Sequence, residues 1–235
     1  MTDATRRHLL MGGAVLAAAA STGHSVAAAE PAKPAKSAFL YQHEPVPLPY
    51  QAGAIKGLSE KLIQSHWENN YIGSVKALNT VRSRLQQAVA DANTPAYVYT
   101  GLKREQLLRT SSVVLHELYF ANLGGDGLAD ASMRSRIAAS FGSFDAWESE
   151  FRKIAQGLGG GSGWVVLGYN TQLGLLENYW MADHATGPVG TTPVLVLDLY
   201  EHSYHMDFGA AVARYIDAFF GTIRWDAAAR RLPVA

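Results

Sequence analysis

The sequence predicts an α+β fold in which helices surround a small sheet. From about residue 58, apolar residues recur every three or four positions, which is the period of amphipathic helices. After Gly159-Gly160-Gly161 the pattern changes to short runs rich in apolar, β-branched and aromatic residues, which are typical of strands. Helical patterning returns from Ala210 to Trp225, and no internal repeat is present.

The first 29 residues have the features of an export signal. The pair Arg6-Arg7 precedes a weakly apolar run, and the small residues Ala27-Ala28-Ala29 follow it. We therefore expect a twin-arginine signal peptide over residues 1–29 and a periplasmic or otherwise exported protein. A membrane anchor would need about 18 or more apolar residues, and this run is shorter. Residues 30–38 are rich in Pro and Lys and predict a flexible linker.

Residues 39–125 are predicted to form a hairpin of two antiparallel helices. The first begins after Ser59, a suitable N-cap, and its apolar positions run from Ile63 to Val89. The second begins near Lys103 and ends at Gly124-Gly125, because paired glycines stop helices.

Residues 126–235 are predicted to form a second domain. Two shorter helices are expected at Ser132–Ala139 and Phe144–Gln156, the latter capped by Ser143. Three apolar runs then follow, WVVLGY, LGLLENYW and TPVLVLD, and Asn170-Thr171-Gln172 predicts a turn between the first two.

Composition limits the possible functions. The 235 residues include 20 basic and 20 acidic side chains, so the net charge of zero gives no indication of a nucleic-acid partner. The sequence contains no cysteine, which excludes disulfides, thiolate catalysis and sulfur-ligated metals. Any metal would have to be bound by His, Asp or Glu side chains.

Four side chains form a candidate metal site. His66 and His116 lie near the apolar stripes of the two long helices, and a hairpin would bring both imidazoles to a shared interior. Either histidine alone would more often be a hydrogen-bonded core residue. Asp198 ends a fully apolar strand, where a carboxylate is costly unless a cation or donors satisfy it. His202 follows four residues later, and this set of ligands suits iron or manganese.

The stretch Asp198-Leu-Tyr-Glu-His202-Ser-Tyr resembles the D-x-W-E-H-A-Y motif of the iron/manganese superoxide dismutases. Similar segments occur at residues 47–50, 141–147 and 161–164, and the resemblance spans about residues 39–225. It implies a helical hairpin followed by an α/β domain with a three-stranded antiparallel sheet. It also implies conversion of superoxide to dioxygen and hydrogen peroxide at one iron or manganese ion. The implied ligands are His66, His116, Asp198 and His202.

The resemblance assigns roles to further residues. His184 and Tyr119 are the predicted catalytic residues. His184 is expected to hydrogen-bond the coordinated solvent, and Tyr119, like Trp164, to line the metal pocket. Asp183-His184 resembles a variant found in iron-using or metal-flexible relatives, so iron is favoured over manganese. Glu201 matches a glutamate that reaches the metal-binding histidine of a second copy, which predicts a homodimer.

Several positions depart from the family pattern. The family's gateway tyrosine is Ser74 here, a nearby histidine is Asn70, and a glutamine of the second helix would fall at Ser112. Tyr200 and His205 replace a tryptophan and a tyrosine. We expect slower or rerouted proton delivery rather than loss of metal binding. A metal-binding protein on this fold with weak or different activity is the alternative, and a zinc hydrolase is a weaker one because no HExxH-like spacing occurs.

Overall fold

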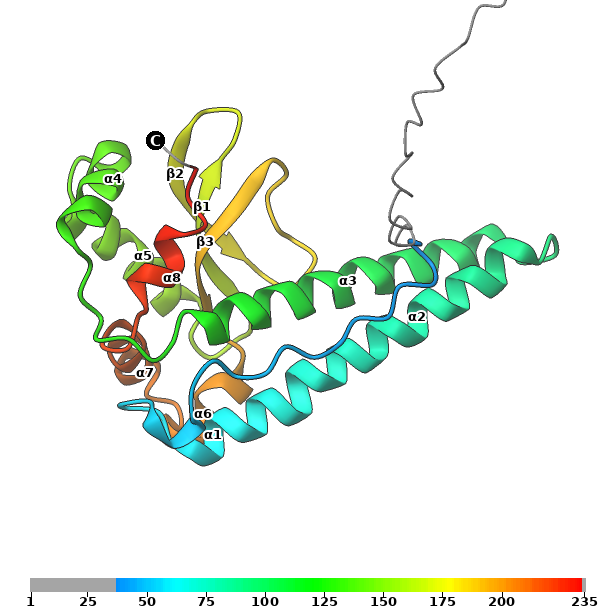
Figure 1. The fold of residues 1–235 in the computed structure, drawn as a ribbon, viewed down its shortest axis with the longest axis horizontal. Helices are drawn as coiled ribbons and strands as arrows, with labels where there is room; N and C mark the ends of the chain where they lie inside the picture. The colour runs from blue at the N-terminus through cyan, green and yellow to red at the C-terminus, as the bar shows by residue number, and fades with distance from the viewer. Residues whose placement is uncertain (1–36, 234–235) are drawn as a thin grey trace, which may run out of the picture. The chain divides into compact units, whose positions relative to one another are not determined.

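The computed structural model describes residues 37–233 (Figure 1). The predicted signal peptide and most of the predicted linker lie outside these residues. Within them, no helix has the length and apolar character needed to cross a bilayer. The expected division of the chain between residues 125 and 126 stays a prediction.

The first predicted long helix is present as three consecutive helical segments. A short helix, η1 (Ala52–Ala54), precedes α1 (Glu60–Ser65), which continues as the π-helix η2 (His66–Tyr71) and then as α2 (Ile72–Ala90). Ser59 is the N-cap, as predicted, and its Oγ accepts a hydrogen bond from Leu62 N at 3.1 Å. The π-helical turn was not anticipated, because apolar spacing does not register one extra residue per turn.

The second long helix, α3 (Ala96–Ala121), begins seven residues before the predicted start. Pro95 occupies its N-cap position, where a missing N–H costs nothing. The first turns carry little apolar periodicity because they face solvent: Tyr97 is 78% exposed. Beside α2, α3 completes the predicted antiparallel hairpin (Figure 1).

Two shorter helices follow, α4 (Ala131–Phe141) and α5 (Phe144–Leu158). The predicted cap Ser143 is confirmed, since its Oγ accepts from Ala146 N at 3.0 Å. Asp130 caps α4 in the same way, accepting from Met133 N at 2.7 Å.

The sheet has three antiparallel strands in the order β2-β1-β3, which confirms the predicted fold class. The strands are β1 (Trp164–Asn170), β2 (Leu175–Met181) and β3 (Thr191–Asp198). The predicted turn joins β1 to β2, and the Asn170 side chain accepts from the backbone N–H groups at residues 172 and 173. The central strand places Trp164 directly opposite Asp198.

The predicted helix over Ala210–Trp225 is interrupted. The structure has α6 (His205–Phe208), α7 (Val212–Phe220) and α8 (Trp225–Ala229), and the short helix η3 (Glu201–Ser203) precedes them. The break occurs because the backbone after α7 bonds to the loop after α3: Thr222 O accepts from Gly125 N at 2.9 Å. Arg224 N donates to Asn122 O at 2.7 Å.

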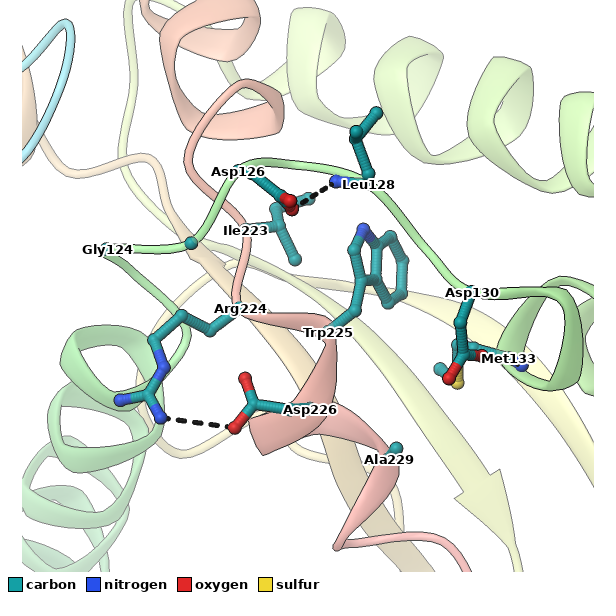
Figure 2. Close-up of a pocket in the computed structure, with 11 residues that line it drawn as sticks. Gly124, Asp126, Leu128, Asp130, Met133, Ile223, Arg224, Trp225, Asp226 and Ala229 are labelled. Atoms are coloured by element: carbon teal, nitrogen blue, oxygen red, sulfur yellow. Dashed lines mark hydrogen bonds and ion pairs between the residues drawn. The ribbon is translucent and has the colours of Figure 1, made fainter.

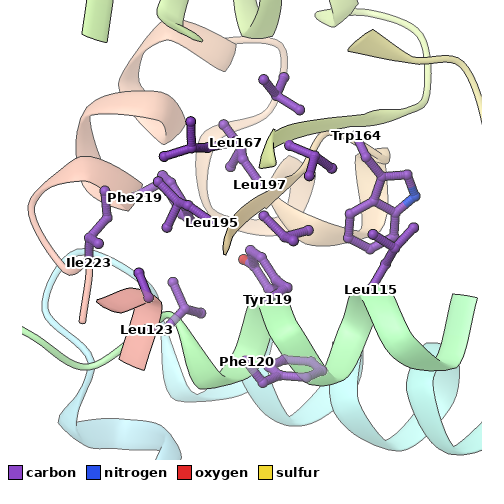
Figure 3. Close-up of a cluster of buried hydrophobic side chains, with 14 of the residues drawn as sticks. Leu115, Tyr119, Phe120, Leu123, Trp164, Leu167, Leu195, Leu197, Phe219 and Ile223 are labelled. Atoms are coloured by element: carbon purple, nitrogen blue, oxygen red, sulfur yellow. The ribbon is translucent and has the colours of Figure 1, made fainter. Parts of the chain in front are cut away.

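The hydrophobic core lies between α3 and the sheet and extends to α7 (Figure 3). Leu115 and Tyr119 of α3 meet Leu195 and Leu197 of β3, all 4% exposed or less. Tight packing of this kind fixes side-chain directions. It therefore fixes the position of the C-terminal half of α3 relative to the end of β3. Both segments carry predicted ligands.

Candidate functional site

The four predicted ligands come together in the interior. His66 begins η2, His116 lies near the end of α3, Asp198 ends β3 and His202 lies within η3. One donor atom from each lies within 4.8 Å of all the others. The side chains of the first three are buried, whereas that of His202 is 27% exposed. We call this group the four-donor site.

The donor atoms converge without bonding one another. Asp198 Oδ2 lies 3.2 Å from Nε2 of His66 and 3.3 Å from Nε2 of His202, and the His116 Nε2 is 3.7 Å away. These four buried atoms nevertheless have no hydrogen-bond partner among the described residues. Two donors about 2.1 Å from a first-row ion, at 90° to 120°, lie roughly 3.0 to 3.6 Å apart. The site therefore fits a metal ion.

Two of the predicted ligands, His116 and Asp198, make hydrogen bonds through their remaining polar atoms. His116 Nδ1 donates to the backbone carbonyl of Ser112 at 2.7 Å, which leaves the Nε2 lone pair free for a cation. Asp198 Oδ1 accepts from Tyr200 N at 2.8 Å, so Oδ2 is the free oxygen. By contrast, His66 Nδ1 has no partner among the described residues.

The electrostatics favour the protonation states that a metal needs. Burial lowers the pKa of His116 to about 3, and it also lowers the pKa of His66. Burial alone would raise the pKa of Asp198, but its contacts with His202 and His66 outweigh this and hold it below its usual value. The site therefore combines the anionic carboxylate of Asp198 with the neutral imidazoles of His66 and His116.

His184, the predicted solvent partner, lies beside the four-donor site. Its Nδ1 accepts from Trp164 Nε1 at 2.9 Å, and its ring centre is 5.9 Å from that of His116. Tyr200 lies between His184 and His202 in a stack of rings with centre distances of 4.8 and 5.3 Å. Burial lowers the pKa of His184, although the Asp198 charge acts in the opposite direction. Its role at the coordinated solvent stays a prediction.

Tyr119, the other predicted catalytic residue, is fully buried with its ring 5.2 Å from that of His66. Its hydroxyl lies 3.1 Å from that of Tyr215, whose own O–H donates to the backbone carbonyl of Asp198 at 2.8 Å. Tyr119 is therefore the donor to Tyr215. Its catalytic role stays a prediction, and the structure gives it a place in the support of Asp198.

Sequence reasoning missed Tyr215 in this support. The residue lies on α7, 17 positions after Asp198, and nothing in local spacing connects the two. The contact of Ser112 with His116 had a detectable signal, because residues four apart on a helix are neighbours.

Two predicted departures form one buried pair. Ser74 Oγ and Ser112 Oγ lie 2.9 Å apart, and both residues are at most 5% exposed. Ser112 Oγ is also 3.4 Å from His116 Nδ1. The two polar side chains therefore satisfy each other behind the His116 imidazole. Asn70 lies in η2 and is partly buried.

A hollow of about 490 Å³ lies away from the four-donor site, around residues 124–133 and 223–229 (Figure 2). Its acidic groups have structural partners: Asp126 accepts from Leu128 N, and Asp226 pairs with Arg224 at 3.2 Å. The polar groups of the hollow hold loops in place. We therefore place the candidate chemistry at the four-donor site.

Comparison with known proteins gives consistent results. Residues 129–231 match the family described as iron/manganese superoxide dismutases, C-terminal domain. Over 193 residues the chain is 48% identical to "Superoxide dismutase [Fe]" of Cupriavidus metallidurans, covering 82% of this chain and 98% of that protein. "Superoxide dismutase [Fe]" of Saccharolobus solfataricus is 30% identical over 198 residues, covering 81% and 93%. "Superoxide dismutase [Mn] 1" of Haloferax volcanii is 32% identical over 200 residues, covering 82% and 96%.

Proposed function

The chain belongs to the iron/manganese superoxide dismutases, and we propose that its reaction takes place at the four-donor site. It is an oxidoreductase that converts superoxide to dioxygen and hydrogen peroxide with iron or manganese as cofactor. The observation that carries the placement is the convergence of four buried donor atoms that bond nothing else among the described residues.

When bound, iron or manganese supplies one-electron redox chemistry by changing between two oxidation states. The chain supplies one negative charge through Asp198 and three neutral nitrogens, so it only partly neutralises a divalent or trivalent cation. The remaining positive charge attracts the superoxide anion. Burial of the ligands excludes bulk water, which strengthens that attraction.

We assign His184 the role of hydrogen-bond donor to solvent or substrate at the site. Its Nδ1 is occupied as an acceptor, and burial favours the neutral imidazole, so its Nε2 carries the proton. A His184→Leu variant should retain metal but lose superoxide removal, whereas His184→Gln should restore part of it. Metal loss in both variants would instead show a structural role.

Proton supply should differ from that of relatives because of Ser74 and Asn70. The Ser74 hydroxyl is buried and bonded to Ser112, so it does not offer a donor at the surface. We expect metal binding to survive and proton uptake to limit the rate. A solvent deuterium isotope effect on turnover measures this, and a value of one would contradict it.

Metal removal and reconstitution test the activity itself. Protein from its own host should contain iron or manganese by elemental analysis, and each reconstituted form should be assayed for superoxide removal. We propose iron as the preferred metal, supported by Asp183-His184 and by the 48% identical relative named for iron. Activity no higher than that of free metal ion would refute the placement at this site.

We propose a homodimer in which Glu201 reaches the second copy. Glu201 is exposed in η3, and its side chain has no hydrogen bond or ion pair among the described residues. The adjacent His202 is partly exposed although its Nε2 is buried, as expected if a partner covers its outer edge. Glu201→Ala should shift the sedimentation coefficient from dimer to monomer, whereas Glu148→Ala, on the surface of α5, should not.

We propose export through residues 1–29, supported by the order of Arg6-Arg7, the apolar run and the small residues. Expression in a bacterial host followed by fractionation should place a chain shortened near Ala29 in the periplasm. Lysine at both arginine positions should keep the longer chain in the cytoplasm. Equal distribution of the two proteins would refute the proposal.

A further inference from the structure

Glu117 connects three parts of the chain beside the four-donor site. It follows His116 on α3, and its Oε1 accepts a hydrogen bond from the Tyr71 hydroxyl at 2.7 Å. The same oxygen lies 2.6 Å from His43 Nε2. The Tyr71 oxygen in turn accepts from Val46 N at 2.7 Å. One carboxylate therefore joins α3, η2 and the segment before η1.

The segment that carries His43 is itself fixed to α2. His43 N donates to Asn79 Oδ1 at 2.8 Å, and Asn79 Nδ2 donates to His43 O at 3.0 Å. The side chains of His43 and Glu117 are only 20% and 24% exposed. The carboxylate thus lies among positioned partners rather than on an open surface.

The partner Tyr71 matters because of its place in η2. This π-helical turn begins with His66 and ends with Tyr71. A π-helical turn is rare and occurs mostly as a single turn within an α-helix, frequently at a functional site. Tyr71 is 1% exposed, and its hydroxyl bond is therefore made in the interior. Burial raises the pKa of Tyr71, which keeps its hydroxyl a donor.

The orientation of the His66 imidazole needs such support more than that of the His116 imidazole. The His116 imidazole is oriented by its bond to Ser112 O, but His66 Nδ1 has no partner among the described residues. The direction of the His66 ring is set by the backbone of η2 and by neighbouring rings. The nearest include His202 at 4.7 Å and Phe120 at 4.9 Å between ring centres.

We propose that Glu117 is a positioning residue, which through Tyr71 holds η2 against α3 and so aims His66 at the metal beside His116. The inference rests on the proposed metal site and deepens it. His116 and Glu117 are adjacent on α3, so the residue that positions His66 lies next to the other histidine. This arrangement fixes the spacing between His66 and His116. Loss of the Tyr71–Glu117 bond should mainly speed metal release.

The test follows transfer of iron from the loaded protein to an excess of chelator. Tyr71→Phe removes one hydroxyl and keeps the ring, and Glu117→Leu removes the acceptor. Each should release iron roughly 10-fold faster or more, the effect typical of residues behind metal ligands. Glu117→Gln retains an acceptor oxygen and should restore most of the original rate. The double variant should release iron more slowly than the product of the two single effects predicts, because the Tyr71–Glu117 bond is lost in both single variants.

Two controls separate positioning from general stability. Glu105→Leu removes another glutamate of α3, one paired with Arg109 at 2.7 Å, and should leave iron release unchanged. His43→Gln removes the His43–Glu117 contact but keeps the Tyr71–Glu117 bond, and should have much less effect than Tyr71→Phe. The electron paramagnetic resonance spectrum of the ferric protein should change in Tyr71→Phe and stay the same in Glu105→Leu.

An unchanged release rate in Tyr71→Phe would overturn the inference, as would equal acceleration by Glu105→Leu or a larger one by His43→Gln. Should Glu117→Leu fail to fold, Tyr71→Phe alone decides. Failure of the proposed function is seen separately, because the unaltered chain would then contain no iron or manganese, or would not remove superoxide when loaded.

Discussion

The burial of His116 makes a quantitative prediction about the metal-free protein. In the unfolded chain its imidazole takes up a proton below the ordinary value of 6.5, whereas burial lowers the pKa of His116 in the folded chain to about 3. Between these values the unfolded state binds more protons, so the free energy of unfolding falls as pH falls. A pH of 4.5 lies two units below the pKa of His116 in the unfolded chain. This difference corresponds to a loss of about 3 kcal/mol in the free energy of unfolding.

The assay is urea unfolding of protein freed of metal by a chelator, at pH 7.5 and pH 4.5. Other groups titrate in this range, and the lowered pKa of His66 acts in the same direction. The contribution of His116 is therefore isolated as a difference against His116→Gln. The difference in free energy of unfolding between the unaltered chain and His116→Gln should change by about 3 kcal/mol between the two pH values.

A suitable control is Ser112→Ala, which alters the same buried site without removing a titrating group. The difference in free energy of unfolding between Ser112→Ala and the unaltered chain should be the same at both pH values. If the difference for His116→Gln is also independent of pH, the imidazole is not held neutral by burial, and the electrostatic account of the four-donor site is wrong.

Two further predictions concern single side chains. Asp198→Asn should abolish retention of iron or manganese in elemental analysis, because the variant lacks the one negatively charged donor of the four-donor site; full metal content would contradict its role. Arg231→Leu leaves the carbonyl of Val194 and the side chain of Asn122 without their guanidinium donor and should cost about 1–3 kcal/mol in thermal unfolding. Arg230→Leu, on the surface, should cost less than about 1 kcal/mol.

The four residues of the four-donor site could be singled out from sequence because each lies in strongly patterned surroundings. His66 and His116 fall near regular apolar stripes, and Asp198 interrupts a strand that is otherwise apolar. Such a carboxylate needs a partner, and His202 is four residues away. The convergence of these four side chains was predictable because burial of a charge is costly enough to be visible in the pattern.

Element boundaries were less predictable where tertiary contacts replace local ones. The first turns of α3 face solvent, so hydrophobic periodicity does not mark them, and Pro95 was the usable signal. The break between α7 and α8 depends on bonds from residues 222 and 224 to a loop about 100 positions earlier. No local pattern carries that information.

The pair of Ser74 and Ser112 shows the same limit at the site itself. In sequence the two residues are separate losses, 38 positions apart, each removing a larger polar side chain of the family pattern. In the structure they are one feature, since their hydroxyls bond to each other and the Ser112 carbonyl holds His116. Either change alone would leave a buried polar side chain facing a group of different size. The two departures are therefore better understood as one buried hydrogen-bonded pair beside His116.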